Sequence, residues 1–274
     1  MREQVKAVRV ELLALDLDGT AAGYDGRVSP RVLAAVHAAR RQGVTVVLAS
    51  GRMLASVRPF WRQFGLGAGY CIAYNGAMVA AMPEARPVLE AHLPSDPARR
   101  LAQAAVGAGL VVQAYVGDEL WISEDDARAR EYIAVNRIPG RLMPPPALWG
   151  WPTPPIKLLL QGDDDALAGY RAEAEPVAAA AGLRVVRSHP HYLEILPGGA
   201  GKGEALAAVA ARLGIPARAV LAIGDAENDL DMIRWAGIGV AMGQALPAVR
   251  AAADWVAPPV EADGAAVAIE RWAL

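Results

Sequence analysis

Cysteine and histidine are scarce in this chain of 274 residues. It contains one cysteine, Cys71, and four histidines. A single cysteine cannot form an intrachain disulfide, and the chain lacks the Cys/His ligand spacing of a structural zinc site. These absences exclude a disulfide scaffold and a zinc-stabilised fold, and they favour a reducing compartment.

A strong charge of one sign and long apolar runs are also missing. The formal net charge is −2, so the chain lacks the basic excess that nucleic-acid binding needs. Hydrophobic residues make up 54% of the chain, yet no apolar run is as long as a membrane span. Residues 1–6 carry mixed charge, and Asp16 and Asp18 interrupt the apolar segment that follows, unlike a signal peptide. We therefore expect a cytoplasmic protein with no nucleic-acid or membrane partner.

Both ends of the chain alternate between strand and helix patterns. Four short apolar runs are typical of buried parallel strands, namely residues 12–17, 44–49, 219–223 and 238–242. Ser29 and Pro30, with Gly43 beyond them, mark the two ends of a helix between the first two runs. The pattern predicts an α/β fold whose core is a doubly wound, Rossmann-like parallel sheet.

The middle of the chain has a different pattern. Strand-like pieces such as residues 111–116 alternate with helical stretches, and a proline-rich loop spans residues 138–155. A chain of this length is expected to contain more than one domain. We predict a core formed by residues 1–92 and 189–274, and an inserted α+β domain formed by residues 93–188.

Two carboxylates stand where the first predicted strand ends. Asp16 and Asp18 are followed by Gly19 and Thr20. In an open parallel sheet, ligands bind beyond the carboxyl ends of the strands. Two such charges need a cation between them, and the hard cation that suits carboxylates and phosphate oxygens is Mg²⁺. The motif therefore predicts phosphoryl transfer that depends on Mg²⁺.

Three further segments place phosphate-compatible residues at a strand end or a helix start. They are Ser50-Gly51-Arg52, Gly201-Lys202-Gly203 and residues 224–229. In this order, and together with the first motif, they resemble the haloacid dehalogenase superfamily. The large insertion, Asn75-Gly76-Ala77 and Leu193-Glu194-Ile195 resemble its Cof-type subfamily. The resemblance implies that the insertion forms a cap over the site.

The resemblance also implies roles for three charged residues. Asp16 is the expected nucleophile, because a carboxylate that attacks phosphorus forms an aspartyl-phosphate and splits one difficult displacement into two easier ones. Asp18 is the expected general acid/base, and its backbone carbonyl is expected to bind the metal. Lys202 is expected to neutralise both Asp16 and the transferring phosphoryl group.

A further set of residues is expected to bind phosphate or substrate: Thr20, Ser50, Gly51, Arg52, Asn75, Lys157 and Asn228. Thr20 and Ser50 supply hydroxyl donors, and a helix that begins near Arg52 can offer backbone N–H groups to phosphate. Asn228 is expected to contact phosphate or a metal-bound water. The resemblance places a lysine at position 157, with an edge-strand lysine whose charge reaches the surface as an equal alternative.

The expected metal ligands are Asp16, Asp18, Asp225 and Asp229. Asp225 resembles the metal ligand of the family. Asp229 either binds the metal directly or orients Lys202 from outside the ligand shell. Val260 stands where many relatives carry asparagine, which removes a polar side chain from that loop.

These residues predict a Mg²⁺-dependent phosphatase for a small phosphorylated metabolite, such as a sugar phosphate, a nucleotide or a phosphorylated cofactor. Two alternatives stay open. One is a sugar phosphomutase, which returns the phosphoryl group to a second hydroxyl of the sugar. The other is a module that binds phosphorylated metabolites and regulates without turnover. The expected partner is the small-molecule substrate, and the chain is expected to be a monomer or a homodimer.

Overall fold

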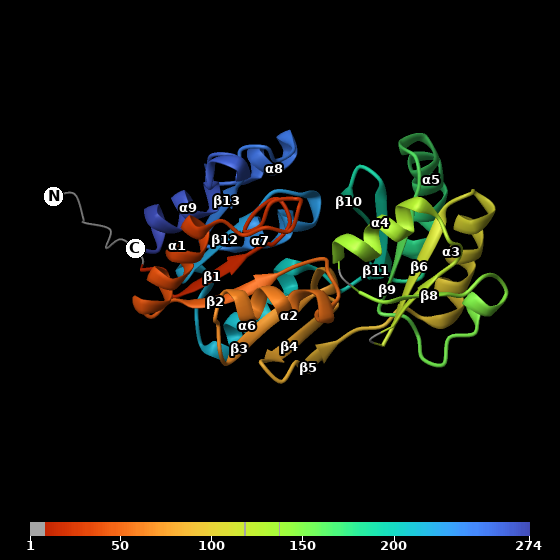
Figure 1. Cartoon of the computed structure of the whole chain (residues 1–274), viewed down its shortest axis with the longest axis horizontal. Coiled ribbons are helices and arrows are strands. Elements are labelled where there is room, and N and C mark those ends of the chain that lie inside the picture. The colour runs from red at the N-terminus through yellow and green to blue at the C-terminus, as the bar shows by residue number, and fades with distance from the viewer. Residues whose placement is uncertain (1–8, 118, 137) are drawn as a thin grey trace.

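The computed structural model of the chain describes residues 9–117, 119–136 and 138–274. Within these ranges it contains one sheet of eight strands and one of six, which occupy the left and right halves of Figure 1. Both ends of the chain build the first sheet, and the middle builds the second. The predicted α/β class with an inserted α+β unit is confirmed. Residues 1–8 of the predicted core lie outside the described residues.

The eight-stranded sheet, here called the core sheet, has the order β14-β13-β12-β1-β2-β3-β4-β5. Its strands are β1 (Leu12–Leu15), β2 (Thr45–Ala49), β3 (Gly69–Ala73), β4 (Met78–Met82), β5 (Arg86–Glu90), β12 (Val220–Gly224), β13 (Ile238–Ala241) and β14 (Trp255–Val256). β1 lies between β12 and β2 and is parallel to both, so the carboxyl ends of these three strands meet at one edge. β4 and β5 continue the sheet beyond β3 as an antiparallel hairpin.

Helices cover both faces of the core sheet. They are α1 (Pro30–Arg41), α2 (Leu54–Gln63), α6 (Lys202–Leu213), α7 (Leu230–Trp235), α8 (Pro247–Ala252) and α9 (Gly264–Trp272). Successive residues of β1 face opposite sides of the sheet. Leu13 and Leu15 pack in the apolar cluster of α1, α2 and α9, whereas Leu12 and Ala14 pack in the cluster of α6 and α7. Because both faces are covered, β1 is a continuous apolar run rather than an alternating one.

The helix predicted after the first strand is α1, and its start has the expected capping. The hydroxyl of Ser29 accepts a hydrogen bond from the backbone N–H of Val32 at 3.1 Å, and Pro30 occupies the first turn. This cap satisfies one of the N–H groups that a helix start leaves without a partner. The predicted helix is therefore confirmed, together with the signals that position it.

The six-stranded sheet, here called the insert sheet, has the order β10-β11-β9-β6-β7-β8. Its strands are β6 (Val111–Val116), β7 (Glu119–Ile122), β8 (Gly140–Leu142), β9 (Lys157–Gln161), β10 (Leu183–His189) and β11 (Tyr192–Pro197), and its helices are α3 (Ser95–Gly107), α4 (Ala127–Asn136) and α5 (Asp164–Ala180). β11 pairs with both β10 and β9. The expected boundary between residues 188 and 189 thus falls inside β10, and the chain leaves this sheet only after Pro197, because β-pairing holds β11 in it.

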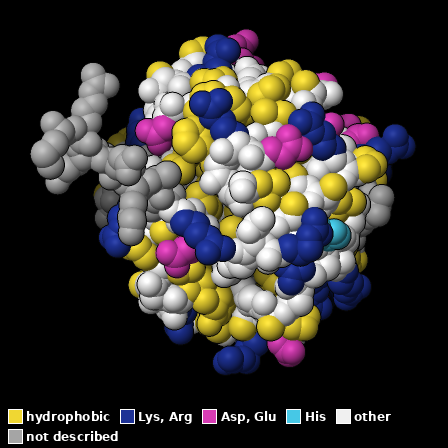
Figure 2. Space-filling model, turned by 90° about the vertical axis from the view of Figure 1, so that its left-hand side faces the viewer, with side chains coloured by type: hydrophobic (Ala, Val, Ile, Leu, Met, Phe, Trp, Pro, Cys, Tyr) yellow, Lys and Arg dark blue, Asp and Glu magenta, His cyan; other side chains and the backbone are white. Residues whose placement is uncertain are grey.

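The surface bears charge of both signs. Figure 2 shows one face on which basic and acidic side chains are spread among apolar and neutral ones. Among the helices that the structure describes, none has the length and apolar composition needed to cross a bilayer.

Gly76 provides a test of how closely two loops of the core approach each other. Gly76 has φ +93°, and a Cβ atom there would lie 2.1 Å from the carbonyl oxygen of Gly201; Gly67 has φ +67° with no atom within 4 Å of the same position. Alanine at either residue carries the cost of left-handed backbone, about 1–2 kcal/mol. We expect Gly76→Ala to lower the melting temperature more than Gly67→Ala, as measured by calorimetry. Equal shifts would contradict the close approach.

Candidate active site

The segments predicted to bind phosphate meet at one edge of the core sheet. Asp16 follows β1, Ser50 follows β2 and Asp225 follows β12, and these strands are parallel neighbours. Lys202, the first residue of α6, reaches the same place from another part of the chain. The fold therefore gathers four segments that are distant in sequence, as the strand-end argument predicts.

Three buried carboxylates form the centre of this site. Asp16, Asp225 and Asp229 each offer an oxygen, and these oxygens lie within 4.8 Å of one another. The ammonium Nζ of Lys202 donates to Oδ1 of Asp16 at 2.7 Å and to Oδ1 of Asp229 at 2.6 Å. Lys202 is only 1% exposed. Three carboxylates beside this ammonium leave an excess of negative charge in a dry environment.

Burial and the charges of neighbouring groups shift the pKa values of the cluster. Burial, and then repulsion by Asp229, raise the pKa of Asp16 well above its ordinary value. The same two causes raise the pKa of Asp225 to about 6. Burial alone would lower the pKa of Lys202, but attraction to Asp16 and Asp229 raises it above its ordinary value. A bound cation would offset the repulsion among the carboxylates.

The donors of this cluster fit Mg²⁺, which takes carboxylate oxygens and keeps several waters. The two oxygens of Asp229 are already engaged: Oδ2 accepts the backbone N–H groups of Asp225 and Ala226 at 2.9 and 3.0 Å, and Oδ1 accepts from Lys202. Oδ2 of Asp225 accepts from the hydroxyl of Tyr24 at 2.8 Å. Asp16 and Asp225 therefore retain more free acceptor capacity than Asp229.

The carboxylate of Asp18 pairs with Arg52 rather than with Lys202. Nε of Arg52 donates to Oδ2 of Asp18 at 2.8 Å, and Nη2 donates to Oδ1 at 2.6 Å. The Asp18 side chain is 39% exposed, whereas Arg52 is buried and lies over the ring of Phe60. Arg52, which was expected to bind phosphate, forms a bidentate ion pair with Asp18, the expected acid/base.

Thr20 and Asn228 each have a buried oxygen with no hydrogen-bond partner in the described part of the chain: Oγ1 of Thr20 and Oδ1 of Asn228. A buried polar atom without a partner is costly, so these two atoms are suited to receive a ligand. The hydroxyl of Ser50, in contrast, accepts the backbone N–H of Arg52 at 3.1 Å. There is no room for a side chain at Gly51, where a Cβ atom would lie 2.8 Å from Oδ1 of Asn75.

Lys157 and Asn75 are brought together by Glu194. Nζ of Lys157 donates to Oε2 of Glu194 at 2.7 Å and to the carbonyl oxygen of Gly51 at 2.7 Å. Nδ2 of Asn75 donates to the same Oε2 at 2.8 Å, and Oδ1 of Asn75 accepts from Nδ2 of Asn228 at 2.7 Å. The alternative of a surface-reaching lysine is wrong, because β9 lies inside the insert sheet and Lys157 is 1% exposed.

Two residues that contact the site, Tyr24 and Gln244, belong to none of the predicted motifs. The exposed Tyr24 bonds Asp225, and Nε2 of Gln244 donates to the carbonyl oxygen of Gly19 and to Oδ2 of Asp225. Oε1 of Gln244 accepts the backbone N–H of Val260 at 3.1 Å, so this loop makes its polar contact without an asparagine side chain. Gln244 follows β13, whose carboxyl end lies at the same sheet edge. Its position just after a predicted strand is the sequence feature from which its contact with the site could have been predicted.

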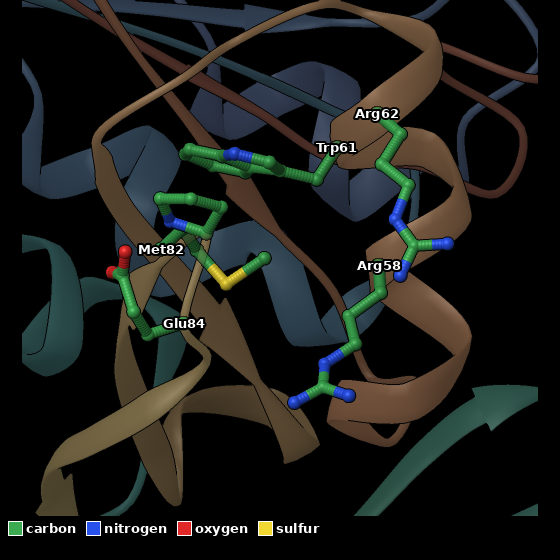
Figure 3. A pocket seen from close by; sticks show the side chains of 6 residues that line it. Arg58, Trp61, Arg62, Met82 and Glu84 are labelled. Atoms are coloured by element: carbon green, nitrogen blue, oxygen red, sulfur yellow. The ribbon is translucent and has the colours of Figure 1, made fainter.

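A surface pocket lies away from this site. Its volume is about 280 Å³, and it is lined by Arg58, Trp61, Arg62, Met82, Pro83 and Glu84. In Figure 3, Arg58 and Arg62 extend from α2 on one side and Glu84 lies opposite them. Trp61 packs against Gly69, the first residue of β3. This pocket is therefore at the amino end of β3, whereas the carboxylates of the site lie at the carboxyl ends of β1 and β12.

The chain has known counterparts in sequence and in structure. Residues 13–269 match the family model for haloacid dehalogenase-like hydrolase. HMP-PP phosphatase of Serratia proteamaculans (strain 568) is 30% identical over 245 residues, which cover 87% of this chain and 86% of that protein. The 5-amino-6-(5-phospho-D-ribitylamino)uracil phosphatase YcsE of Bacillus subtilis (strain 168) is 27% identical over 275 residues, 100% of both proteins. A haloacid dehalogenase-like hydrolase from Bacteroides thetaiotaomicron has a TM-score of 0.84 at 31% identity, covering 96% of this chain and 99% of that one.

Removal of Lys202 tests the charge balance of the cluster. Lys202→Met leaves two buried carboxylates without their ammonium partner, so we expect the free energy of unfolding to fall by about 3–5 kcal/mol. Arg130→Met is the matched control, because Arg130 pairs with Asp125 where both side chains are 62% exposed. Such surface pairs contribute about 0–1 kcal/mol. Urea unfolding without divalent metal measures both, and equal losses would refute the argument.

Proposed function

Because this chain belongs to the haloacid dehalogenase-like hydrolase family, as a Cof-type member and a phosphoric monoester hydrolase, we propose that it is a Mg²⁺-dependent phosphatase of small metabolites that works through an aspartyl-phosphate on Asp16. The buried cluster of Asp16, Asp225 and Asp229 beside Lys202 is the observation that carries the proposal. Phosphoryl transfer needs a positioned nucleophile and positive charge near the phosphate oxygens. Asp16 is positioned as the nucleophile, and the excess of carboxylates favours binding of a cation that would supply the positive charge.

Asp16, Asp225 and the backbone carbonyl of Asp18 are the proposed metal ligands. Asp229 is proposed to act on Lys202, because both of its oxygens are already hydrogen-bonded within the chain. Bound Mg²⁺ would supply positive charge that offsets the repulsion between the carboxylates and the phosphate. Thr20, whose buried hydroxyl has no partner among the described residues, is proposed to donate to a phosphate oxygen.

The proposed reaction has two displacements at phosphorus. Lys202 holds Oδ1 of Asp16, which leaves Oδ2 to attack. The new bond joins Oδ2 to phosphorus as the ester P–O bond breaks, and Asp18 gives its proton to the leaving oxygen. Asp18 then takes a proton from a water that attacks the phosphorus, which releases phosphate and restores Asp16. The bidentate contact with Arg52 orients the ionised form of Asp18, which is the form that takes the proton from water. The protonated form that serves the leaving oxygen does not keep this ion pair.

The insert sheet is proposed to act as a cap that covers the leaving group. Lys157 of β9 donates to the carbonyl oxygen of Gly51 at 2.7 Å, and Gly51 directly precedes Arg52, so the insert sheet contacts the loop that holds the partner of the proposed acid/base. A cover of this kind excludes water and can select the substrate. Two relatives named as phosphatases of small phosphorylated compounds support this substrate class.

A screen of the purified protein against a panel of phosphorylated metabolites tests the function. We expect phosphate release from at least one small phosphate ester with Mg²⁺, and loss of release when EDTA removes the metal. Isomerisation of a sugar phosphate that requires a hexose bisphosphate would instead indicate a phosphomutase. Binding of phosphorylated compounds without any release would indicate a regulatory module.

The Asp16→Asn variant tests the nucleophile. An amide cannot form the acyl-phosphate, so we expect phosphate release to become undetectable, while the fold stays intact by circular dichroism. Asp165→Asn is the matched control, since Asp165 is exposed in the first turn of α5. A steady-state phosphate assay measures both variants. Turnover by Asp16→Asn at the rate of the control would rule out the covalent route.

A further inference from the structure

A hydrogen-bonded series of four side chains, three of them buried, connects the insert sheet to the proposed phosphoryl site. Lys157 on β9 and Glu194 on β11 belong to the insert sheet. Asn75, in the short 3-10 helix η1 (Tyr74–Gly76), and Asn228, in η4 (Glu227–Asp229), follow strands of the core sheet. Lys157, Glu194 and Asn75 are each at most 2% exposed, so solvent does not compete for their hydrogen bonds.

The carboxylate of Glu194 sets the direction of the hydrogen bonds that Asn75 and Asn228 donate. A carboxylate accepts and does not donate, so Asn75 must turn its NH₂ group toward Glu194. The carbonyl oxygen of Asn75 then faces Asn228, which must present its own NH₂ group. Asn228 is left with its carbonyl oxygen Oδ1 at the far end, buried and without a partner among the described residues.

Lys157 keeps this direction fixed. The Lys157 ammonium donates to Oε2 of Glu194 at 2.7 Å, and it has no acceptor atom of its own. Oε2 is thus held between two donors, Lys157 and Asn75. Lys157 is itself held by the carbonyl oxygen of Gly51 and by the face of Tyr115, whose ring centre is 4.7 Å from Nζ. The pair therefore bridges the insert sheet and the loop after β2.

We propose that Lys157 and Glu194 are positioning residues, which act through Asn75 to turn the carbonyl oxygen of Asn228 toward the phosphoryl site. This inference rests on the proposed function. Asn228 lies between Asp225 and Asp229 in the sequence. Its carbonyl oxygen suits a hydrogen-bond donor, such as a water molecule or a substrate hydroxyl, and not an ionised phosphate oxygen, which can only accept. The relay makes the orientation of Asn228 depend on the docking of the insert sheet against the core.

Glu194→Gln tests the relay with little change of shape. Glutamine can donate as well as accept, so Asn75 and then Asn228 are free to reverse. With 4-nitrophenyl phosphate and Mg²⁺, we expect kcat to fall about tenfold, the scale of contacts just outside a site, with a smaller change in KM. Asp163→Asn, which removes an exposed ion pair with Arg128 in the insert, is the control and should leave kcat unchanged. An unchanged kcat in Glu194→Gln would overturn the relay.

A double-mutant cycle separates positioning from general loss of structure. If Glu194 acts through Asn228, Glu194→Gln should have no further effect on kcat in an Asn228→Ala background. A merely structural role would lower kcat by the same factor in both backgrounds, and that result would refute the relay. Melting temperatures of the four proteins show whether each variant is folded at the assay temperature.

A measurement without turnover distinguishes failure of the relay from failure of the proposed function. The side-chain amide resonances of Asn228 are identified by NMR through their loss in Asn228→Ala. We expect them to shift in Glu194→Gln and to stay in place in Asp163→Asn. If wild-type protein releases no phosphate, the proposed phosphatase activity fails while these resonances still judge the relay. Asn228 resonances that do not move in Glu194→Gln would contradict it.

Discussion

The structure of the site depends on the burial of three carboxylates beside the ammonium of Lys202. Asp16, Asp225 and Asp229 repel one another in a dry environment, and Lys202 compensates only part of that charge. Burial first, and then repulsion by Asp229, raise the pKa values of Asp16 and Asp225. A fold does not gain stability from such a cluster, since apolar residues of similar volume would pack at lower cost. The arrangement fits the cation binding and phosphoryl transfer that we propose for this site.

The backbone around the cluster is built to let these groups approach. A Cβ atom at Gly224 would lie 2.4 Å from Cγ of Asp229, and one at Gly19 would lie 2.2 Å from Oδ2 of Asp225. The glycines next to the acidic motifs therefore leave the space that the carboxylates fill. Parallel pairing of β1 with β12 then aligns the two motifs at one sheet edge.

The insert sheet contributes polar contacts to the core as well as cover. Lys157 and Glu194 come from its strands, yet they contact Gly51 and Asn75 of the core at 2.7 and 2.8 Å. Buried polar contacts across two units require a defined relative placement, because each group left without a partner is costly. The site is thus assembled from both sheets, although the carboxylates all follow strands of one.

The sequence by itself determined the α/β class, helix α1 with its Ser29 cap, and the strands that carry Asp16 and Asp225, because apolar runs, capping residues and strand-end motifs act over a few neighbouring residues. It also indicated which residues belong to one site, since strand ends of a parallel sheet share an edge. Only the tertiary structure decided the partners: Arg52 with Asp18, Lys157 with Glu194, and Gln244 with Asp225. It also decided that β11 stays in the insert sheet. Such pairings join residues far apart in the chain, and they are selected by distance, burial and charge in the folded molecule rather than by any local pattern.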